Sequence, residues 1–310
     1  MTSSAPQKYQ TTNWKDYNNA LKKRGSMLIW IDKEMAWNGV PSGKRGRSKT
    51  YSDAAIQFCL MIKNLYGLGL RQTIGMVESL LKLANVDWSV PDFSTLSKRQ
   101  KNLIVNIPYR RPSNGLHLLV DSTGIKMLGE GEWKTKKHGA DYRRQWLKVH
   151  LAIDAQSLEV RAIEVTTNEV GDAPMLSELL SQIPTNEEIK TVTADGAYDT
   201  KNCHQAIAKR GADAVIPVRK NAAFWKENRE GAQVRNEALR ATKRFGRTLW
   251  KKWTGYHRRS LVETKMRCFK LLGERVMARD FDRQVAELQI RAALLNRFTY
   301  LGTPITVVMP

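Results

Sequence analysis

Cysteine is scarce in this sequence, whose 310 residues include only Cys59, Cys203 and Cys268. None of the three stands in a Cys-x-x-Cys pair or beside paired histidines, so neither a disulfide framework nor a zinc site is predicted. We expect each thiol to pack as a small apolar side chain. The five histidines are equally scattered. Any metal chemistry of this chain should therefore depend on carboxylates.

Acidic residues are also few, and long apolar runs are missing. The chain has 30 Asp and Glu against 51 Lys and Arg, which gives a formal charge of +21. Such an excess is typical of nucleic-acid-binding proteins, and an anionic membrane surface is the competing partner. No apolar stretch of 18 residues is present, and the first residues, MTSSAPQKYQ, lack the apolar core of a signal peptide. We expect no membrane contact and a cytoplasmic protein.

Three short amphipathic helices are predicted in the first third of the chain. They begin near Ser52, near Arg71 and within PDFSTLSKRQKNL, and the last one presents a basic face that includes Lys98 and Arg99. Three helices with a basic last helix resemble a helix-turn-helix unit that binds DNA, although a purely structural bundle has the same pattern. The RRPSNG run after Pro108 is typical of a linker. We therefore predict a helical DNA-binding region over residues 1–112.

A basic arm precedes these helices. The run PSGKRGRSKT contains Lys44, Arg45 and Arg47 and has no acidic residue, and its glycines and proline favour an irregular backbone. One interpretation is an arm that follows DNA phosphates or enters a minor groove. A linker without contacts is the other.

The following residues predict a mixed α/β domain over 113–310. Strands are expected at 116–120, 146–154, 158–166, 190–194 and 215–218, and helices at 173–181, 200–210 and 284–300. The short turn AQS joins the second and third strands as an antiparallel hairpin. Three strands in hairpin order, then helix, strand, helix and strand, is the element order of the ribonuclease-H-like fold.

Two aspartates follow strands of this domain. Asp121 comes directly after the first strand, and Asp195 comes directly after the fourth. Each one alone is equally explained as a turn residue. If the two strands are parallel neighbours, as this fold places them, the two carboxylates lie side by side.

A third candidate carboxylate lies in YHRRSLVETKMRCFK, residues 256–270. The spacing places Tyr256, Arg259, Glu263 and Lys270 near one face of a single predicted helix. A carboxylate among bases suits a site where it holds a cation while the bases hold phosphates. A solvated cationic helix with an incidental Glu is the alternative.

Several motifs together resemble the DDE transposases of the insertion-sequence-five family, nearly from end to end. They are VDSTG, TADGAYD, GEGEWK, PDFSTLSKR and the pattern Tyr, two residues, Arg, three residues, Glu, six residues, Lys. The resemblance implies that Asp121, Asp195 and Glu263 form a catalytic triad in a ribonuclease-H-like core. It also implies that the protein binds two divalent ions and moves the bacterial DNA element that encodes it.

The chemistry of such a site can be stated from its donors. Three carboxylates without His or Cys suit Mg²⁺, with Mn²⁺ as a substitute. Two ions would activate a water or a 3′-hydroxyl and stabilise the leaving oxygen. Arg259 and Lys270 would hold phosphates, and Tyr256 would hydrogen-bond or stack nearby. The expected partners are terminal inverted repeats and target DNA, bound by a homodimer or larger assembly. A nuclease of the same fold and a domesticated, non-transposing DNA-binding protein are the rival interpretations.

A strongly basic insertion is predicted at about residues 219–255. From 219 to 260, 13 Lys and Arg oppose 3 Glu. Aromatic residues are interleaved with these bases: Phe224, Trp225, Phe245, Trp250 and Trp253. The mixture fits a groove that neutralises phosphates and stacks unpaired bases, while anchoring of a surface insertion by its rings fits equally well.

Overall fold

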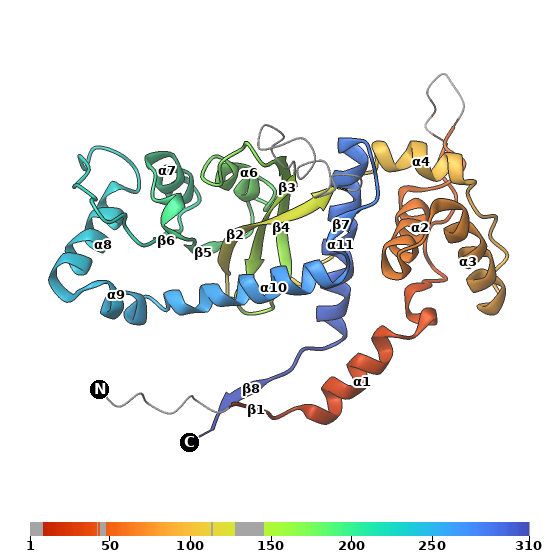
Figure 1. Ribbon diagram of the computed structural model, residues 1–310, viewed down its shortest axis with the longest axis horizontal. Helices are drawn as coiled ribbons and strands as arrows, with labels where there is room; N and C mark the ends of the chain where they lie inside the picture. Colours follow the sequence, from red (N-terminus) through yellow and green to blue (C-terminus); the bar gives the residue numbers. More distant parts are fainter. Residues whose placement is uncertain (1–8, 42, 44–47, 113, 128–145, 310) are drawn as a thin grey trace, which may run out of the picture.

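The protein is described from a computed structural model that covers the chain except residues 1–8, 42, 44–47, 113, 128–145 and 310, and the side chains of residues 28–29 (Figure 1). Its centre is a mixed sheet with the strand order β4-β3-β2-β5-β6, and a short β7 pairs with β2. The strands are β2 (Leu116–Met127), β3 (Trp146–Asp154), β4 (Val160–Thr167), β5 (Ile189–Thr193), β6 (Asp213–Val215) and β7 (Arg275–Val276).

The sheet combines an antiparallel half and a parallel half. β2, β3 and β4 pair antiparallel, as the predicted hairpin order requires. β5 lies parallel to β2, and β6 lies parallel to β5. This topology confirms the predicted mixed α/β class and is consistent with a ribonuclease-H-like core.

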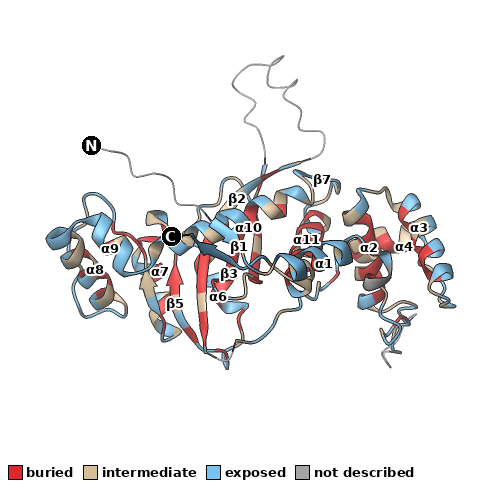
Figure 2. Cartoon of the chain, turned by 90° about the horizontal axis from the view of Figure 1, so that it is seen from below, coloured by how far each residue is buried: buried red, intermediate tan, exposed pale blue. Residues whose placement is uncertain are grey.

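Helices cover both faces of the sheet because the side chains of β2 alternate between two apolar cores. Leu118 and Val120 pack with residues of α6 (Met175–Ser181) and α7 (Lys201–Lys209). Leu119 and Ile125 pack with residues of α10 (Ser260–Leu271) and α11 (Phe281–Leu301) on the other face. Figure 2 shows the buried residues concentrated on the sheet and on the helix faces that meet it.

The predicted N-terminal helices are present. They are α2 (Asp53–Tyr66), α3 (Leu70–Leu83) and α4 (Phe93–Lys101), preceded by α1 (Trp14–Arg24) and the 3-10 turn η1 (Met27–Trp30). Ser52 caps α2, since its side chain accepts a hydrogen bond from the amide of Ala55 at 2.9 Å. Gly67 ends α2 with φ of 62°, which a residue with a Cβ rarely adopts.

These N-terminal helices share an apolar core with the last helix of the chain. Ile290 and Leu294 of α11 are fully buried among residues of α2, α3 and α4. Lys63 of α2 also lies 3.6 Å from Glu287 of α11. The division of the chain at residue 112 therefore remains a proposal about domains, because α11 contributes to cores on both sides of it.

The basic segment forms two further helices, α8 (Ala232–Phe245) and α9 (Arg247–Trp253). They lie beyond β6, at the opposite end of the molecule from α2, α3 and α4 (Figure 1). The two ends of the described chain meet in a small antiparallel ribbon of β1 (Tyr9–Thr11) and β8 (Thr306–Val308). No helix in the described part is long and apolar enough to cross a membrane.

Three local expectations were wrong. Asp121 does not end its strand: β2 continues to Met127, because β3 goes on pairing with it as far as Lys126, and this ladder overrides the turn chemistry of DSTG. Residues 256–270 are not a single α-helix, since Tyr256–Arg259 forms the 3-10 turn η3 and α10 begins at Ser260. The last predicted core strand lies at Asp213–Val215 rather than at 215–218.

Candidate catalytic site

The parallel pairing of β2 and β5 places two carboxylates next to each other. Leu119 pairs with Thr193 in the register of the two strands. Asp121 lies two residues after Leu119, and Asp195 lies two residues after Thr193. Both therefore lie just beyond the residues that pair β2 with β5, at the same level of the sheet. The pKa of Asp121 is raised, first because burial disfavours its charge and also because the charge of Asp195 lies close by.

The backbone after β5 fixes the position of Asp195. Its Oδ1 accepts a hydrogen bond from the amide of Ala197 at 2.8 Å, which caps the 3-10 turn η2 (Gly196–Tyr198). Arg219 donates to the carbonyls of Gly196 and Ala197 from outside this turn. The loop that carries Asp195 is therefore held from both sides.

Arg259 connects the third carboxylate to the first. Its Nη1 lies 2.5 Å from Oδ2 of Asp121, and its Nη2 lies 2.7 Å from Oε1 of Glu263. The side chains of Arg259 and Asp121 are each 18% exposed, whereas that of Glu263 is 56% exposed. α10 thus brings Glu263 to Asp121 across the sheet face, with a guanidinium between the two carboxylates.

Tyr256 and Lys270 lie at the same place. Tyr256 is half-buried, and its pKa is raised by burial and by the charges of Asp195 and Asp121, although Arg259 opposes this. Lys270 lines an open pocket of about 450 Å³ together with Asp121 and Glu263. The structure therefore brings together all three predicted carboxylates, Tyr256, Arg259 and Lys270.

The predicted N-terminal DNA contacts lie elsewhere. Lys98 and Arg99 line a separate pocket of about 480 Å³ beside residues 48–51. Arg99 is engaged internally, because its guanidinium bonds to the carboxylate of Asp53 and to the carbonyl of Tyr51. Lys44, Arg45 and Arg47 fall outside the described residues.

Sequence reasoning missed two groups at the site. Arg267 lines the pocket of Asp121 and Glu263. Its position one helical turn after Glu263 in the sequence could have identified it. Asp199 is buried and is bonded by Nε and Nη2 of Arg235, each at 3.3 Å, and by the amide of Arg219. Burial alone would raise the pKa of Asp199, but the nearby Nε2 of His204, 3.3 Å from its Oδ1, and the bonds from Arg235 lower it to about 2. This pair fastens α8 to the turn that Asp195 caps.

The rings of the basic segment divide into two kinds. Trp250 is buried, and Trp225 packs against the guanidinium of Arg235 at 4.4 Å from the ring centroid. Phe224 and Phe245 are exposed beside Lys243 and Arg244, and Trp253 is exposed beside the ring of Phe245. The anchoring interpretation therefore applies to the first two rings, and the stacking interpretation stays open for the other three.

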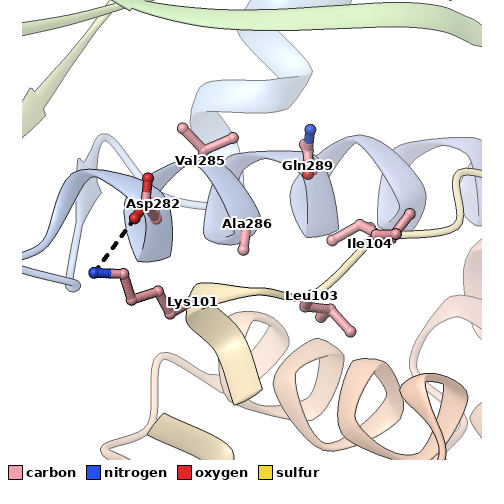
Figure 3. Close-up of a pocket in the computed structure, with 8 residues that line it drawn as sticks. Lys101, Leu103, Ile104, Asp282, Val285, Ala286 and Gln289 are labelled. Carbon is pink, nitrogen blue, oxygen red and sulfur yellow. Dashed lines mark ion pairs between the residues drawn. The ribbon is translucent and has the colours of Figure 1, made fainter. Parts of the chain in front are cut away.

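A further pocket, of about 340 Å³, differs from the pocket of Asp121 and Glu263 in the chemistry of its lining (Figure 3). It lies between α11 and the segment after α4, and Leu103, Ile104 and Val285 line it. Its charged residues, Lys101 and Asp282, pair with each other at 3.5 Å. No group for acid–base or phosphate chemistry is left in it.

The donors of the carboxylate site fit hard divalent cations, since their ligand atoms are oxygens and neither His nor Cys lines the adjoining pocket. Nevertheless, no group of three His, Cys, Asp or Glu side chains among the described residues is arranged to hold a metal as it stands. In this arrangement Arg259 bonds to both Asp121 and Glu263.

Comparison with protein families gives two matches. A family model described as "Transposase DDE domain" matches residues 112–297, which is more than half of the chain. A second model with the same description matches residues 22–130. The first match contains the whole sheet and all three carboxylates.

Proposed function

Because the chain belongs to the family of transposases with a DDE domain, we propose that it binds the terminal inverted repeats of an insertion sequence, cleaves at the element ends and joins the 3′ ends to target DNA. As a member of this family, the chain is an enzyme that cleaves and transfers DNA, and DNA is its partner. Assignment to the insertion-sequence-five group, recognition of the repeats and the course of strand transfer are our extension.

The observation that carries the proposal is the convergence of Asp121, Asp195 and Glu263. Asp121 and Asp195 follow the last paired residues of the parallel strands β2 and β5, and Glu263 of α10 is connected to Asp121 through Arg259. A protein that only bound DNA would have no use for three converging carboxylates in a chain of charge +21. This favours a catalytic role over a domesticated DNA-binding protein.

Enzymes of this family use divalent metal ions, and we propose that the triad holds two Mg²⁺ ions, which Mn²⁺ can replace. When bound, such ions activate a water or a 3′-hydroxyl and stabilise the oxygen that leaves. The carboxylates supply hard oxygen ligands, and the half-buried position of Asp121 limits the number of competing waters. No covalent bond between protein and DNA is needed.

The remaining residues of the site would bind and orient DNA. Lys270 and Arg267 lie beside the carboxylates in one open pocket, where they can hold phosphates on either side of the reacting one. Tyr256 offers a ring and a hydroxyl at the same edge. The exposed Phe224, Phe245 and Trp253 of the basic segment offer further rings on which unpaired bases can stack.

Recognition of the element ends is assigned to the N-terminal helices. Lys98 is exposed on α4 and lines a pocket with Lys49, Thr50 and Thr95, a set that suits a backbone phosphate. Arg99 would support this surface rather than contact DNA, because Asp53 and Tyr51 already hold it. Two ends must be held together during transposition, so we propose a homodimer or a larger assembly on DNA.

The test uses Asp121→Asn, Asp195→Asn and Glu263→Gln in the full chain. Each should abolish Mg²⁺-dependent cleavage of end DNA while binding of that DNA persists, because carboxylates hold cations but repel phosphate. A gel assay with a pre-cleaved end separates a transposase from a nuclease of the same fold, since only a transposase joins that end to a target. Substantial activity in any one variant would remove that residue from the triad.

A further inference from the structure

Arg259 holds two carboxylates of the site at once. The two Nη atoms of its guanidinium bond to Asp121 at 2.5 Å and to Glu263 at 2.7 Å. The planar fork of arginine suits such bridging, whereas the ammonium of lysine acts as a point charge. The bridge joins β2 to α10, and these elements have no backbone hydrogen bond to each other.

The same oxygens are those that divalent cations would need. A guanidinium and a metal ion compete for Oδ2 of Asp121 and Oε1 of Glu263, because two cations held at the same oxygens repel each other. Without any cation, Asp121, Asp195 and Glu263 would repel one another, and two of them would lose a bonded partner. One internal cation therefore compensates for the charge of the site in the arrangement seen here.

We propose that Arg259 is an exchangeable counter-cation: it bridges Asp121 and Glu263 in the metal-free protein, leaves them when divalent ions bind, and then pairs with a phosphate of the bound DNA. The inference rests on the proposed function of the triad. It makes Arg259 a positioning residue with two competing sets of partners.

The position of Arg259 supports this exchange. Arg259 ends the 3-10 turn η3 and directly precedes α10, and its side chain is partly exposed, so it can change rotamer while the backbone of both elements stays in place. Glu263 is largely exposed, so one half of the bridge opens directly to solvent. Lys270 and Arg267 lie in the adjoining pocket, so a phosphate held there would be within reach of a released guanidinium.

The first test measures the binding of Mn²⁺ to the full chain without DNA. The electron paramagnetic resonance signal of free Mn²⁺ reports how much of the ion remains unbound. Arg259→Gln should bind Mn²⁺ about tenfold more tightly than the wild type, which is the size expected for coupling between two competing ligands of one site. Arg267→Gln is the matched control, because it removes the same charge from the pocket that Asp121 and Glu263 line. Its affinity should change much less.

Thermal unfolding in EDTA gives a second readout. Arg259→Gln should lower Tm by about 2–4 °C, the shift expected for roughly 1 kcal/mol in a domain of this size. Adding Mn²⁺ should then raise its Tm by more than that of the wild type. Arg259→Lys retains the charge without the fork, and should fall between the two in Mn²⁺ affinity.

DNA binding tests the second set of partners, with a fluorescent 30-base-pair duplex of random sequence as the probe. In the wild type, Mn²⁺ should steepen the dependence of log affinity on log salt by about 0.9, because one more phosphate is paired. In Arg259→Gln, Mn²⁺ should leave the slope unchanged.

Two results would overturn the inference: Mn²⁺ binding by Arg259→Gln that is no tighter than in the wild type, or equal tightening by Arg267→Gln. An Arg259→Gln chain that fails to fold leaves Arg259→Lys to decide, with wild-type affinity counting against the exchange. The proposed function fails separately, if Asp121→Asn binds Mn²⁺ as well as the wild type does.

Discussion

Lys270 provides the sharpest test at the scale of single residues. It lies with Asp121 and Glu263 around one pocket, where a phosphate would approach. Lys270→Ala should therefore slow both cleavage and joining, and flatten the plot of log affinity against log salt by about 0.9 on duplex DNA. Lys209→Ala is the matched control, since Lys209 is exposed on α7, which packs against the opposite face of the sheet. Equal salt slopes for wild type and Lys270→Ala would make Lys270 an ordinary solvated lysine.

A second residue-scale prediction concerns pH and His150. His150 is fully buried on β3, its Nε2 is 3.0 Å from Oγ1 of Thr166, and Asp172 and Lys148 are the charges nearby. Burial lowers its pKa to about 4, despite the opposing charge of Asp172. The unfolded chain takes up this proton below about pH 6.5, whereas the folded chain does so only near pH 4. The free energy of unfolding should therefore fall by about 3 kcal/mol between these values on account of His150 alone.

Urea unfolding at several pH values measures this contribution. His150→Gln keeps a polar group beside Thr166 but cannot titrate, so the variant should lose less stability on acidification than the wild type. If the two proteins lose stability in parallel from pH 7 to pH 4, His150 is not the titrating group.

At the scale of elements, the basic segment is fixed to the core by one buried ion pair. Arg235 of α8 bonds to Asp199 and to the carbonyl of Ala223, and both charged side chains are at most 3% exposed. Arg235→Met removes one partner and leaves Asp199 buried without it, so we expect a loss of about 3–5 kcal/mol in the free energy of unfolding. Because Asp199 follows the turn that Asp195 caps, cleavage should slow as well.

Arg240→Met is the control for this change. Arg240 also lies on α8, but its pair with Glu227 is exposed, and exposed pairs contribute little. Urea unfolding of the two variants should therefore separate them clearly. Similar stability of Arg235→Met and Arg240→Met would show that α8 does not depend on this contact.

On the scale of the whole molecule, the N-terminal helices and the core are not independent. Ile290 and Leu294 of α11 complete the core of α2, α3 and α4. A fragment of residues 113–310 should therefore expose this face of α11, bind the dye ANS and unfold at a lower urea concentration than the full chain. Wild-type stability of the fragment, without dye binding, would instead support a clean domain boundary near residue 112.

The same contact bears on DNA recognition. The predicted DNA-binding region over residues 1–112 implies that a fragment of these residues binds end DNA, and this stays a prediction. Because such a fragment lacks Ile290 and Leu294, specific binding is better measured on the full chain with Lys98→Ala, compared between end DNA and random DNA. The basic segment and the N-terminal helices lie at opposite ends of the molecule (Figure 1), so DNA that contacts both must run along its length.

The sequence by itself determined most of the elements and the candidate residues of the site. Local hydrophobic patterns and caps specify most strands and helices, because period and capping act within a few residues. The motifs around Asp121, Asp195 and Glu263, through the transposase family that they resemble, were enough to predict one catalytic centre.

Only the tertiary structure decided how these residues are arranged. The bridge from Arg259 to Asp121, the anchoring of α8 by Arg235 and Asp199, and the place of α11 in two cores join residues far apart in the chain. The continuation of β2 past Asp121 depends on its partner β3. Such contacts arise from strand register and from the packing of distant faces, and a local pattern carries no information on either.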